Sequence, residues 1–161
     1  MPEEKQISGA GFSRDILEFL RLLEKHEVRY VIVGGEAVIF YGYPRFTGDI
    51  DFFFARDMEN IERLYQCLLD FWNGSIPALQ EAGELAQEGL VLQFGRPPHR
   101  LDLLNKIDGI DFEEAWSGRQ KVSINASDGS IRAFYLGKAE LLKNKAASSR
   151  PKDLDDIEHL S

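Results

Sequence analysis

The sequence contains a single cysteine, Cys67, and only three histidines. One cysteine excludes an internal disulfide bond and a cysteine metal cluster, and the helical spacing of its apolar neighbours predicts that Cys67 lies in the core. The histidines, His26, His99 and His159, lack the spacing of metal ligands. No segment resembles a P-loop or a nucleophile elbow, and no Ser-His-Asp set can be argued from spacing. Chemistry based on sulfur or imidazole is therefore not expected.

The sequence also lacks long apolar runs and an excess of basic residues. No apolar run approaches about 18 residues, the length typical of a membrane-spanning helix, and residues 1–12 contain no hydrophobic signal segment. We therefore expect a soluble, cytoplasmic protein with no membrane partner. Nineteen Lys and Arg against 27 Asp and Glu give a net charge of −8, which argues against extended nucleic-acid binding through phosphate neutralisation. A small or locally docked binding partner remains compatible with this charge.

Length and apolar content indicate one ordered unit. A chain of 161 residues with 43% apolar residues and eleven Phe is expected to form a single domain across residues 1–161. The polar, glycine-containing residues 1–11 predict a mobile lead, and residues 137–160 predict a helical C-terminal end. No internal repeat or low-complexity tract is visible.

Periodicity predicts the helices and strands. Helices are predicted at residues 14–26, 36–42, 57–72, 75–82, 111–116, 137–147 and 150–160, with Ser13 and Asp57 as N-caps. Strands are predicted at residues 29–33, 49–55, 90–94, 99–104, 121–125 and 131–135, and residues 83–89 and 95–98 are predicted to be a loop and a turn. These elements predict an α/β (α+β) fold, with a small mixed, largely antiparallel sheet flanked by helices.

One stretch, residues 34–51 (GGEAVIFYGYPRFTGDID), stands out. A predicted strand runs into Gly34-Gly35 and a short helix, and a loop then leads to the next strand. Asp49 and Asp51 lie two residues apart on that strand, so both side chains leave the same face with their Cα atoms roughly 6.5–7 Å apart. Ile50, Phe52 and Phe54 are predicted to point the other way, into the core.

This arrangement suits a cation on one side and an anion on the other. Carboxylates at this spacing suit Mg²⁺, which takes oxygen ligands and commonly shares them with substrate phosphates. A Gly-Gly turn lets backbone N–H groups approach an anion at a helix N-terminus. The combination is typical of phosphoryl or nucleotidyl transfer. The alternative is a tight turn followed by an edge strand with solvated acids.

A strand, Gly-Gly, a short helix and Asp-Ile-Asp together resemble the active-site signature of the polymerase-beta-like nucleotidyltransferase superfamily. The form R-x-T-x-D-I-D, with Arg45 and Thr47 before the two aspartates, is similar to the small AbiEii-like, or minimal, branch. Many members carry Gly-Ser in the turn, where the hydroxyl contacts a nucleotide phosphate. Here the second residue is Gly35, followed by Glu36, so the turn offers backbone groups.

A third carboxylate is implied by the segment HRLDLL at residues 99–104. Asp102 lies between leucines on a predicted strand, and burying an unpaired carboxylate is costly. The resemblance implies that Asp102 is the third metal-binding carboxylate, on a strand beside Asp49 and Asp51. The alternative is an edge strand on which Asp102 is solvated or paired with Arg100, since both side chains share one face.

The tail of the sequence adds to the resemblance. Residues 145–157, which contain Arg-Pro-Lys-Asp from Arg150 onward, are similar to the pattern that ends many minimal nucleotidyltransferases. The implication is that Lys145 and Arg150 turn inward and offer charge to a triphosphate, while Asp153 caps the last helix or holds one of these cations. The alternative is a solvated, charged helix.

The resemblance implies a nucleotidyltransferase-like fold and a metal-dependent nucleotidyltransferase. It would move a nucleoside monophosphate from a triphosphate such as ATP or GTP to an unidentified acceptor hydroxyl, with release of pyrophosphate. One Mg²⁺ would be held by Asp49 and Asp51, and a second by the same pair with Asp102. The phosphates would be positioned by six residues: Gly34, Gly35, Arg45, Thr47, Lys145 and Arg150.

The acceptor and the partners are left open by the sequence. A small molecule, a protein or a tRNA end could supply the hydroxyl. A rival hypothesis is a catalytically silent module that binds nucleotides or partners, for example one component of a bacterial toxin–antitoxin pair with a small helical partner protein. A third hypothesis, a structural Ca²⁺ site, conflicts with the absence of EF-hand ligand spacing.

Overall fold

The computed structural model describes residues 4–43, 49–96 and 100–160. Its strands are β1 Lys5–Ser8, β2 Tyr30–Val33, β3 Asp49–Phe54, β4 Val91–Phe94, β5 Arg100–Leu104, β6 Gln120–Ala126 and β7 Gly129–Tyr135. Its α-helices are α1 Arg14–Lys25, α2 Gly34–Phe40, α3 Met58–Phe71, α4 Phe112–Ser117, α5 Lys138–Ser148 and α6 Pro151–Leu160. Two short 3-10 helices, η1 Gly9–Gly11 and η2 Ala82–Ala86, complete the described elements.

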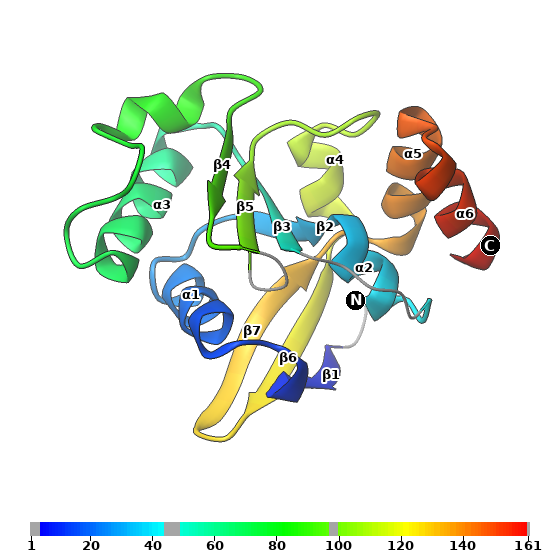
Figure 1. Ribbon diagram of the computed structural model, residues 1–161, viewed down its shortest axis with the longest axis horizontal. Helices are drawn as coiled ribbons and strands as arrows, with labels where there is room; N and C mark the ends of the chain where they lie inside the picture. The colour runs from blue at the N-terminus through cyan, green and yellow to red at the C-terminus, as the bar shows by residue number, and fades with distance from the viewer. Residues whose placement is uncertain (1–3, 44–48, 97–99, 161) are drawn as a thin grey trace.

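The strands form one mixed sheet in the order β1-β6-β7-β2-β3-β5-β4 (Figure 1). The pairs β2–β3, β4–β5 and β6–β7 are antiparallel, whereas β1–β6, β2–β7 and β3–β5 are parallel. The antiparallel ladders contain more of the paired residues, and helices flank the sheet (Figure 1). The predicted fold class is therefore confirmed.

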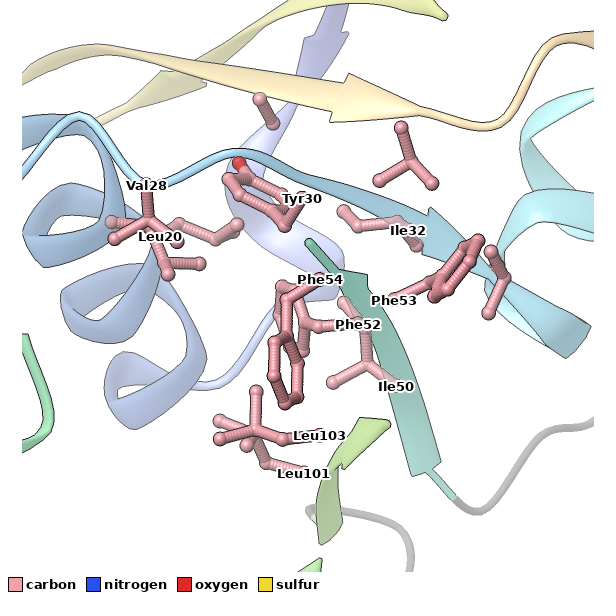
Figure 2. Packing of buried hydrophobic residues seen from close by; sticks show 14 of the residues in the cluster. Leu20, Val28, Tyr30, Ile32, Ile50, Phe52, Phe53, Phe54, Leu101 and Leu103 are labelled. Carbon is pink, nitrogen blue, oxygen red and sulfur yellow. The ribbon is translucent and has the colours of Figure 1, made fainter. Parts of the chain in front are cut away.

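Side chains of β3 alternate between the two faces of the sheet, as its sequence predicts. Phe52 packs edge-on against Phe19 of α1, with ring centroids 5.3 Å apart, and Figure 2 shows it among the buried residues of this layer. Phe53 points to the opposite face and packs against Phe112 of α4, also at 5.3 Å. Since Asp49 and Asp51 share the face of Phe53, the two acids lie on the α4 side of the sheet.

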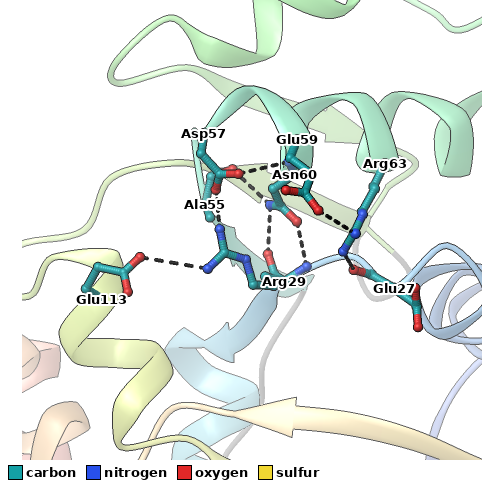
Figure 3. A network of polar contacts seen from close by, with 8 residues as sticks. All are labelled: Glu27, Arg29, Ala55, Asp57, Glu59, Asn60, Arg63 and Glu113. Carbon is teal, nitrogen blue, oxygen red and sulfur yellow. Dashed lines mark hydrogen bonds and ion pairs between the residues drawn. The ribbon is translucent and has the colours of Figure 1, made fainter.

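A buried asparagine ties the last residues of β3 to the start of β2 (Figure 3). Asn60, in the first turn of α3, accepts a hydrogen bond from the backbone N–H of Arg29 at 2.7 Å and donates to the carbonyl of Arg29 at 3.0 Å. Its amide also donates to the carbonyl of Ala55 at 2.9 Å. Asp57 caps the same helix through Asn60 N–H, as the sequence predicts. The network fixes the C-terminal end of β3 beside the N-terminal end of β2.

The prediction of a mobile lead over residues 1–11 was wrong for residues 5–11, where the structure describes a strand and a short 3-10 helix. Residues Lys5–Ser8 form β1, which pairs in parallel with the edge of β6, with Ile7 opposite Ile124. Backbone hydrogen bonds to an exposed strand edge need no particular side-chain pattern, and the segment KQIS shows none that would reveal a strand. The N-terminal residues therefore extend the sheet.

The predicted helix at residues 75–82 was also wrong. Pro77 has no N–H to donate, and the next residue, Ala78, has a φ of 66°, which interrupts a right-handed helix. A short 3-10 helix, η2, begins instead at Ala82, the last residue of the predicted helix, and otherwise lies within residues predicted to be a loop. The other predicted helices and strands are present, with ends displaced by one or two residues. Within the described ranges, no helix is long and apolar enough to cross a membrane.

Candidate active site

The parallel pairing of β3 with β5 brings the three predicted carboxylates together. Asp51 lies directly opposite Asp102, and Asp49 lies opposite Arg100. One carboxylate oxygen from each of Asp49, Asp51 and Asp102 lies within 4.8 Å of the other two. The prediction that Asp102 belongs to the strand beside the Asp-Ile-Asp segment is confirmed, and we call these three residues the acidic triad.

The strand that carries Asp102 is an internal one. Strand β5 pairs with β3 on one side and β4 on the other, and Asp102 is only 6% exposed. Leu101 and Leu103 on either side of it point to the opposite face and are buried. The alternative of a solvated acid on an edge strand is therefore wrong. The other possibility named with it, a pairing of Asp102 with Arg100, is present in the structure.

Arg100 bridges two members of the acidic triad. Its Nη2 donates to Oδ2 of Asp49 at 2.5 Å and to Oδ2 of Asp102 at 3.2 Å. Its Nε lies 3.0 Å from Oδ1 of Asp102. The contact with Asp49 was missed by the sequence analysis, because it depends on the register between two strands 51 residues apart in the chain. The one available signal was the i, i+2 spacing, which puts Arg100 on the face of Asp102.

Gly34 leaves the space that Asp51 occupies. The residue follows β2, where Val33 pairs with Asp51, and its φ is +68°, a conformation that strongly favours glycine. A Cβ atom at this position would clash with Oδ2 of Asp51 and would lie 3.3 Å from its Cγ. The predicted proximity of the glycine turn to the carboxylates is confirmed, and helix α2 begins at the turn itself.

The acidic triad carries more negative charge than Arg100 balances. Burial, together with the charges of Asp49 and Asp102, raises the pKa of Asp51 to about 7, and Arg100 acts in the opposite direction. Burial and a hydrogen bond with Asp49 also raise the pKa of Asp102. Among the described residues, the buried Oδ1 of Asp51 has no hydrogen-bond partner. An orphaned buried carboxylate oxygen amid excess negative charge fits a divalent cation.

Comparison with protein families gives the same class of activity. A family described as "Nucleotidyltransferase of unknown function (DUF6036)" matches residues 14–160. The chain belongs to this nucleotidyltransferase family. None of the curated proteins compared with it matches. The family match supports the predicted nucleotidyltransferase class, and the acidic triad supplies carboxylates suited to its chemistry.

Lys145 of this DUF6036 protein turns inward, as predicted, and meets two carboxylates of α6. Its Nζ lies 3.1 Å from Asp153 Oδ1 and 3.2 Å from Asp156 Oδ2, and all three side chains are buried. The alternative of a solvated, charged helix is therefore wrong for these residues. Figure 1 shows α5 and α6 as a pair at one end of the molecule, with α3 at the other.

Arg150 is held at the start of α6 by the same aspartate. Its backbone N–H and its Nε donate to Oδ2 of Asp153 at 3.2 and 2.7 Å. Asp153 thus caps the helix and also holds the two cations, Arg150 and Lys145. The sequence analysis offered these two roles of Asp153 as alternatives. No described contact joins either cation to the acidic triad.

Two candidate site residues from the sequence analysis lie outside the described residues, as does one of the three histidines. Arg45 and Thr47 belong to residues 44–48, and His99 belongs to residues 97–99. Tyr43, the last described residue before the first gap, donates its hydroxyl to Asp155 Oδ2 at 2.7 Å and stacks on His159 with ring centroids 4.0 Å apart. The chain leading to Arg45 therefore starts against α6.

Proposed function

We propose that this protein transfers a nucleoside monophosphate from a nucleoside triphosphate to an acceptor hydroxyl and releases pyrophosphate. The observation that carries the proposal is the acidic triad at the start of β3 and β5, beside the Gly34 turn, in a chain of a nucleotidyltransferase family. Carboxylates on adjacent rigid strands keep their spacing while substrate enters and product leaves.

Two divalent cations would be held by the acidic triad. Asp49 and Asp51 would hold the cation that accompanies the triphosphate, and Asp102 would complete a second site with the same pair. Bound Mg²⁺ would neutralise phosphate charge and lower the pKa of the acceptor hydroxyl. The excess negative charge and the orphaned Oδ1 of Asp51 support this assignment.

The residues around the triad would position the triphosphate. Helix α2 has no side-chain cap at Val33, so we infer that the N–H groups of Gly34 and Gly35 are available to phosphate oxygens. The resemblance adds Arg45 and Thr47. Arg150 keeps a largely exposed side chain and could reach phosphate, whereas Lys145 is enclosed by two aspartates. We therefore assign Lys145 first to the packing of α5 on α6.

In the reaction, the acceptor hydroxyl oxygen would attack the α-phosphorus of the triphosphate. The bond from that phosphorus to the oxygen bridging the β-phosphate would break, and pyrophosphate would leave opposite the incoming oxygen. The hydroxyl proton would pass to a carboxylate of the acidic triad. These residues would thus align the two oxygens and disperse the charge that develops between them.

The finer assignments follow from the sequence pattern and the charge. We propose, from the R-x-T-x-D-I-D form, that the chain belongs to the AbiEii-like branch and uses ATP or GTP as donor. The net charge of −8 favours a small molecule, a protein side chain or a locally docked tRNA end as acceptor. Incubation with each labelled triphosphate and a cell extract would identify the acceptor by the label that it gains.

The substitution Asp51→Asn tests the metal site. It keeps the shape of a side chain on the polar face of β3 and removes an anionic ligand, so we expect a folded protein that has lost Mg²⁺-dependent nucleotide binding. Thermal melts and nucleotide titrations would be compared with those of Asp15→Asn, an exposed residue in the first turn of α1. If Asp51→Asn binds Mg²⁺-nucleotide like the parent protein, the metal assignment is wrong.

Pyrophosphate release separates this proposal from the rival hypothesis. An active enzyme would release pyrophosphate from at least one triphosphate in the presence of Mg²⁺ and extract, and Asp51→Asn would not. Nucleotide binding without pyrophosphate release from any of the triphosphates would favour the catalytically silent module, with a small helical protein as the partner to seek.

A further inference from the structure

The proposed function gives Asp49, Asp51 and Asp102 to divalent cations but leaves Arg100 without a role. We propose that Arg100 and the divalent cation compete for the same carboxylates, so that Arg100 sets the affinity of the site for its cation. The inference rests on the proposed function, because it takes the acidic triad as the cation site.

The guanidinium of Arg100 contacts carboxylate oxygens that a cation shared by Asp49 and Asp102 would use. It contacts Oδ2 of Asp49 and both oxygens of Asp102, at 2.5, 3.2 and 3.0 Å. A cation shared by Asp49 and Asp102 would need lone pairs of these same carboxylates. A guanidinium about 3 Å from those oxygens would also repel a doubly charged ion at the same place.

The backbone keeps Arg100 in this position. Its Cα pairs with that of Asp49 across the parallel β3–β5 ladder, in the register that puts Asp102 opposite Asp51. A shift of the strand would therefore separate Asp102 from Asp51 as well. The guanidinium can leave the carboxylates only by rotation of its own side chain.

The contacts of Arg100 are ones that a cation could displace. Nε of Arg100 and Oδ1 of Asp102 are 3.0 Å apart, yet neither is aligned to form a hydrogen bond. The side chain of Arg100 is 30% exposed, against 8% for that of Asp102, so part of the Arg100 side chain lies next to solvent. A partly exposed, imperfectly aligned ion pair is weaker than an enclosed one.

The substitution Arg100→Gln would remove the competing charge while leaving a polar side chain. Binding of Mn²⁺ alone would be measured by calorimetry at one fixed pH. We expect the affinity to rise about tenfold or more, the change that corresponds to one hydrogen bond to a charged group. Arg100→Lys, which keeps the charge, should stay nearer to the parent protein.

The matched control is Arg63→Gln, which changes net charge equally. Arg63 lies on α3 and contacts Glu59 at 2.6 Å and the carbonyl of Glu27 at 3.2 Å. Its substitution should leave Mn²⁺ affinity within about twofold of the parent value, because distant surface charges are screened. The comparison separates the direct contact from the general effect of removing a positive charge.

The outcomes distinguish this inference from the proposed function. Equal Mn²⁺ affinities for Arg100→Gln and Arg63→Gln overturn the inference alone, provided that binding to the parent protein is lost in Asp51→Asn. Failure of both the parent protein and folded Arg100→Gln to bind Mn²⁺ overturns the cation site and the inference with it.

A second measurement uses the parent protein and does not depend on whether Arg100→Gln folds. The Nε–Hε signal of Arg100 would be followed by NMR and assigned by its loss in Arg100→Lys. We expect saturating Mg²⁺ to shift this signal and to accelerate its exchange with water. A signal that stays unchanged while resonances of the acidic triad respond to Mg²⁺ would contradict the inference.

Discussion

Two groups of carboxylates in this molecule each surround a basic side chain. In the α5–α6 group, Lys145 and Arg150 face Asp153 and Asp156, and Lys145 and both acids are almost completely buried. At the acidic triad, Arg100 is the one basic side chain among the described residues that contacts the carboxylates, at Asp49 and Asp102, and part of the group remains exposed. Counting the described residues, the first group is balanced in charge and buried except for Arg150, whereas the second has an excess of negative charge and is partly open.

The pKa of Asp153 in the first group and the pKa values of Asp51 and Asp102 in the second move in opposite directions. Burial acts to raise the pKa of Asp153, but its contacts with Arg150 and Lys145 outweigh burial and lower it. Burial and neighbouring acids raise the pKa of Asp51 to about 7. The contacts of Asp153 already stabilise it as an anion, whereas those of Asp51 do not. The comparison therefore favours packing as the role of the first group and supports the proposed cation binding by the second.

The largest expected effect on stability comes from Lys145→Met. The substitution would leave Asp153 and Asp156 buried without their shared cation, which typically costs about 3–5 kcal/mol. Urea unfolding would measure the loss. The control Lys143→Met removes an exposed lysine of the same helix, 2.8 Å from Glu114, and should change stability little. An equally small loss for Lys145→Met would contradict the assignment of Lys145 to packing.

Asp102→Asn should affect turnover strongly and nucleotide binding weakly. Asp49 and Asp51 would still hold the cation that accompanies the triphosphate, so nucleotide affinity should stay within a few-fold of the parent value. Turnover should fall by about two orders of magnitude, because the lost interaction acts mainly in the transition state. Steady-state kinetics and a nucleotide titration would separate the two effects.

Two other results for Asp102→Asn are informative. Normal turnover would mean that the site works with two carboxylates and that Asp102 serves mainly as a partner of Arg100. An unfolded variant, detected by thermal melting, would assign Asp102 to the stability of the sheet.

Gly34→Ala tests the packing of the glycine turn on Asp51. The clash with Asp51 should cost about 1–3 kcal/mol, beyond the cost of alanine at a positive φ, and should weaken Mn²⁺ binding. Gly89→Ala is the matched control, since Gly89 has a φ of +84° and nothing within 4 Å of its hypothetical Cβ. Equal losses of unfolding free energy for the two variants would show that only backbone conformation matters at residue 34.

The smallest expected effect is a pH dependence of stability in metal-free protein. The pKa of Asp51 is raised from 3.8 to about 7, so the folded state binds more protons than the unfolded state between these values. The free energy of unfolding should therefore fall as the pH rises from about 4 to about 7. The slope should stay below about 1.4 kcal/mol per pH unit, because Asp51 is partly exposed.

The contribution of Asp51 is isolated by subtraction. The slope of unfolding free energy against pH for Asp51→Asn would be subtracted from the slope for the parent protein. Saturating Mg²⁺ should reduce this difference between the slopes. A parent protein that gains stability over the same range, relative to Asp51→Asn, would contradict the raised pKa of Asp51.

Local sequence patterns predicted much of the candidate site. Alternation of Asp49 and Asp51 with Ile50 and Phe52 showed which face each acid takes, and flanking leucines showed the same for Asp102. These inferences held because a strand has a period of two whatever its partners are. The Gly34 turn was predicted from the same local logic, although its steric fit to Asp51 was not.

Features that depend on long-range pairing could not be predicted. The sequence does not show that β3 and β5 run parallel with Asp51 opposite Asp102, and so it could not place Arg100 against Asp49. Likewise, the inward direction of Lys145 followed from the resemblance, whereas its enclosure by Asp153 and Asp156 depends on how α6 folds back on α5. The sheet register and the helix packing are set by the whole core.

Strand β1 has a consequence for the solution behaviour of the protein. It covers the outer edge of β6, which contains the apolar Val122 and Ile124 within seven residues. The edge that β1 itself presents is only four residues long and begins with Lys5. Short, charged edges discourage strand-to-strand association between molecules. By pairing with the seven-residue strand β6, the four residues of β1 leave a shorter sheet edge, of the kind that discourages association between molecules.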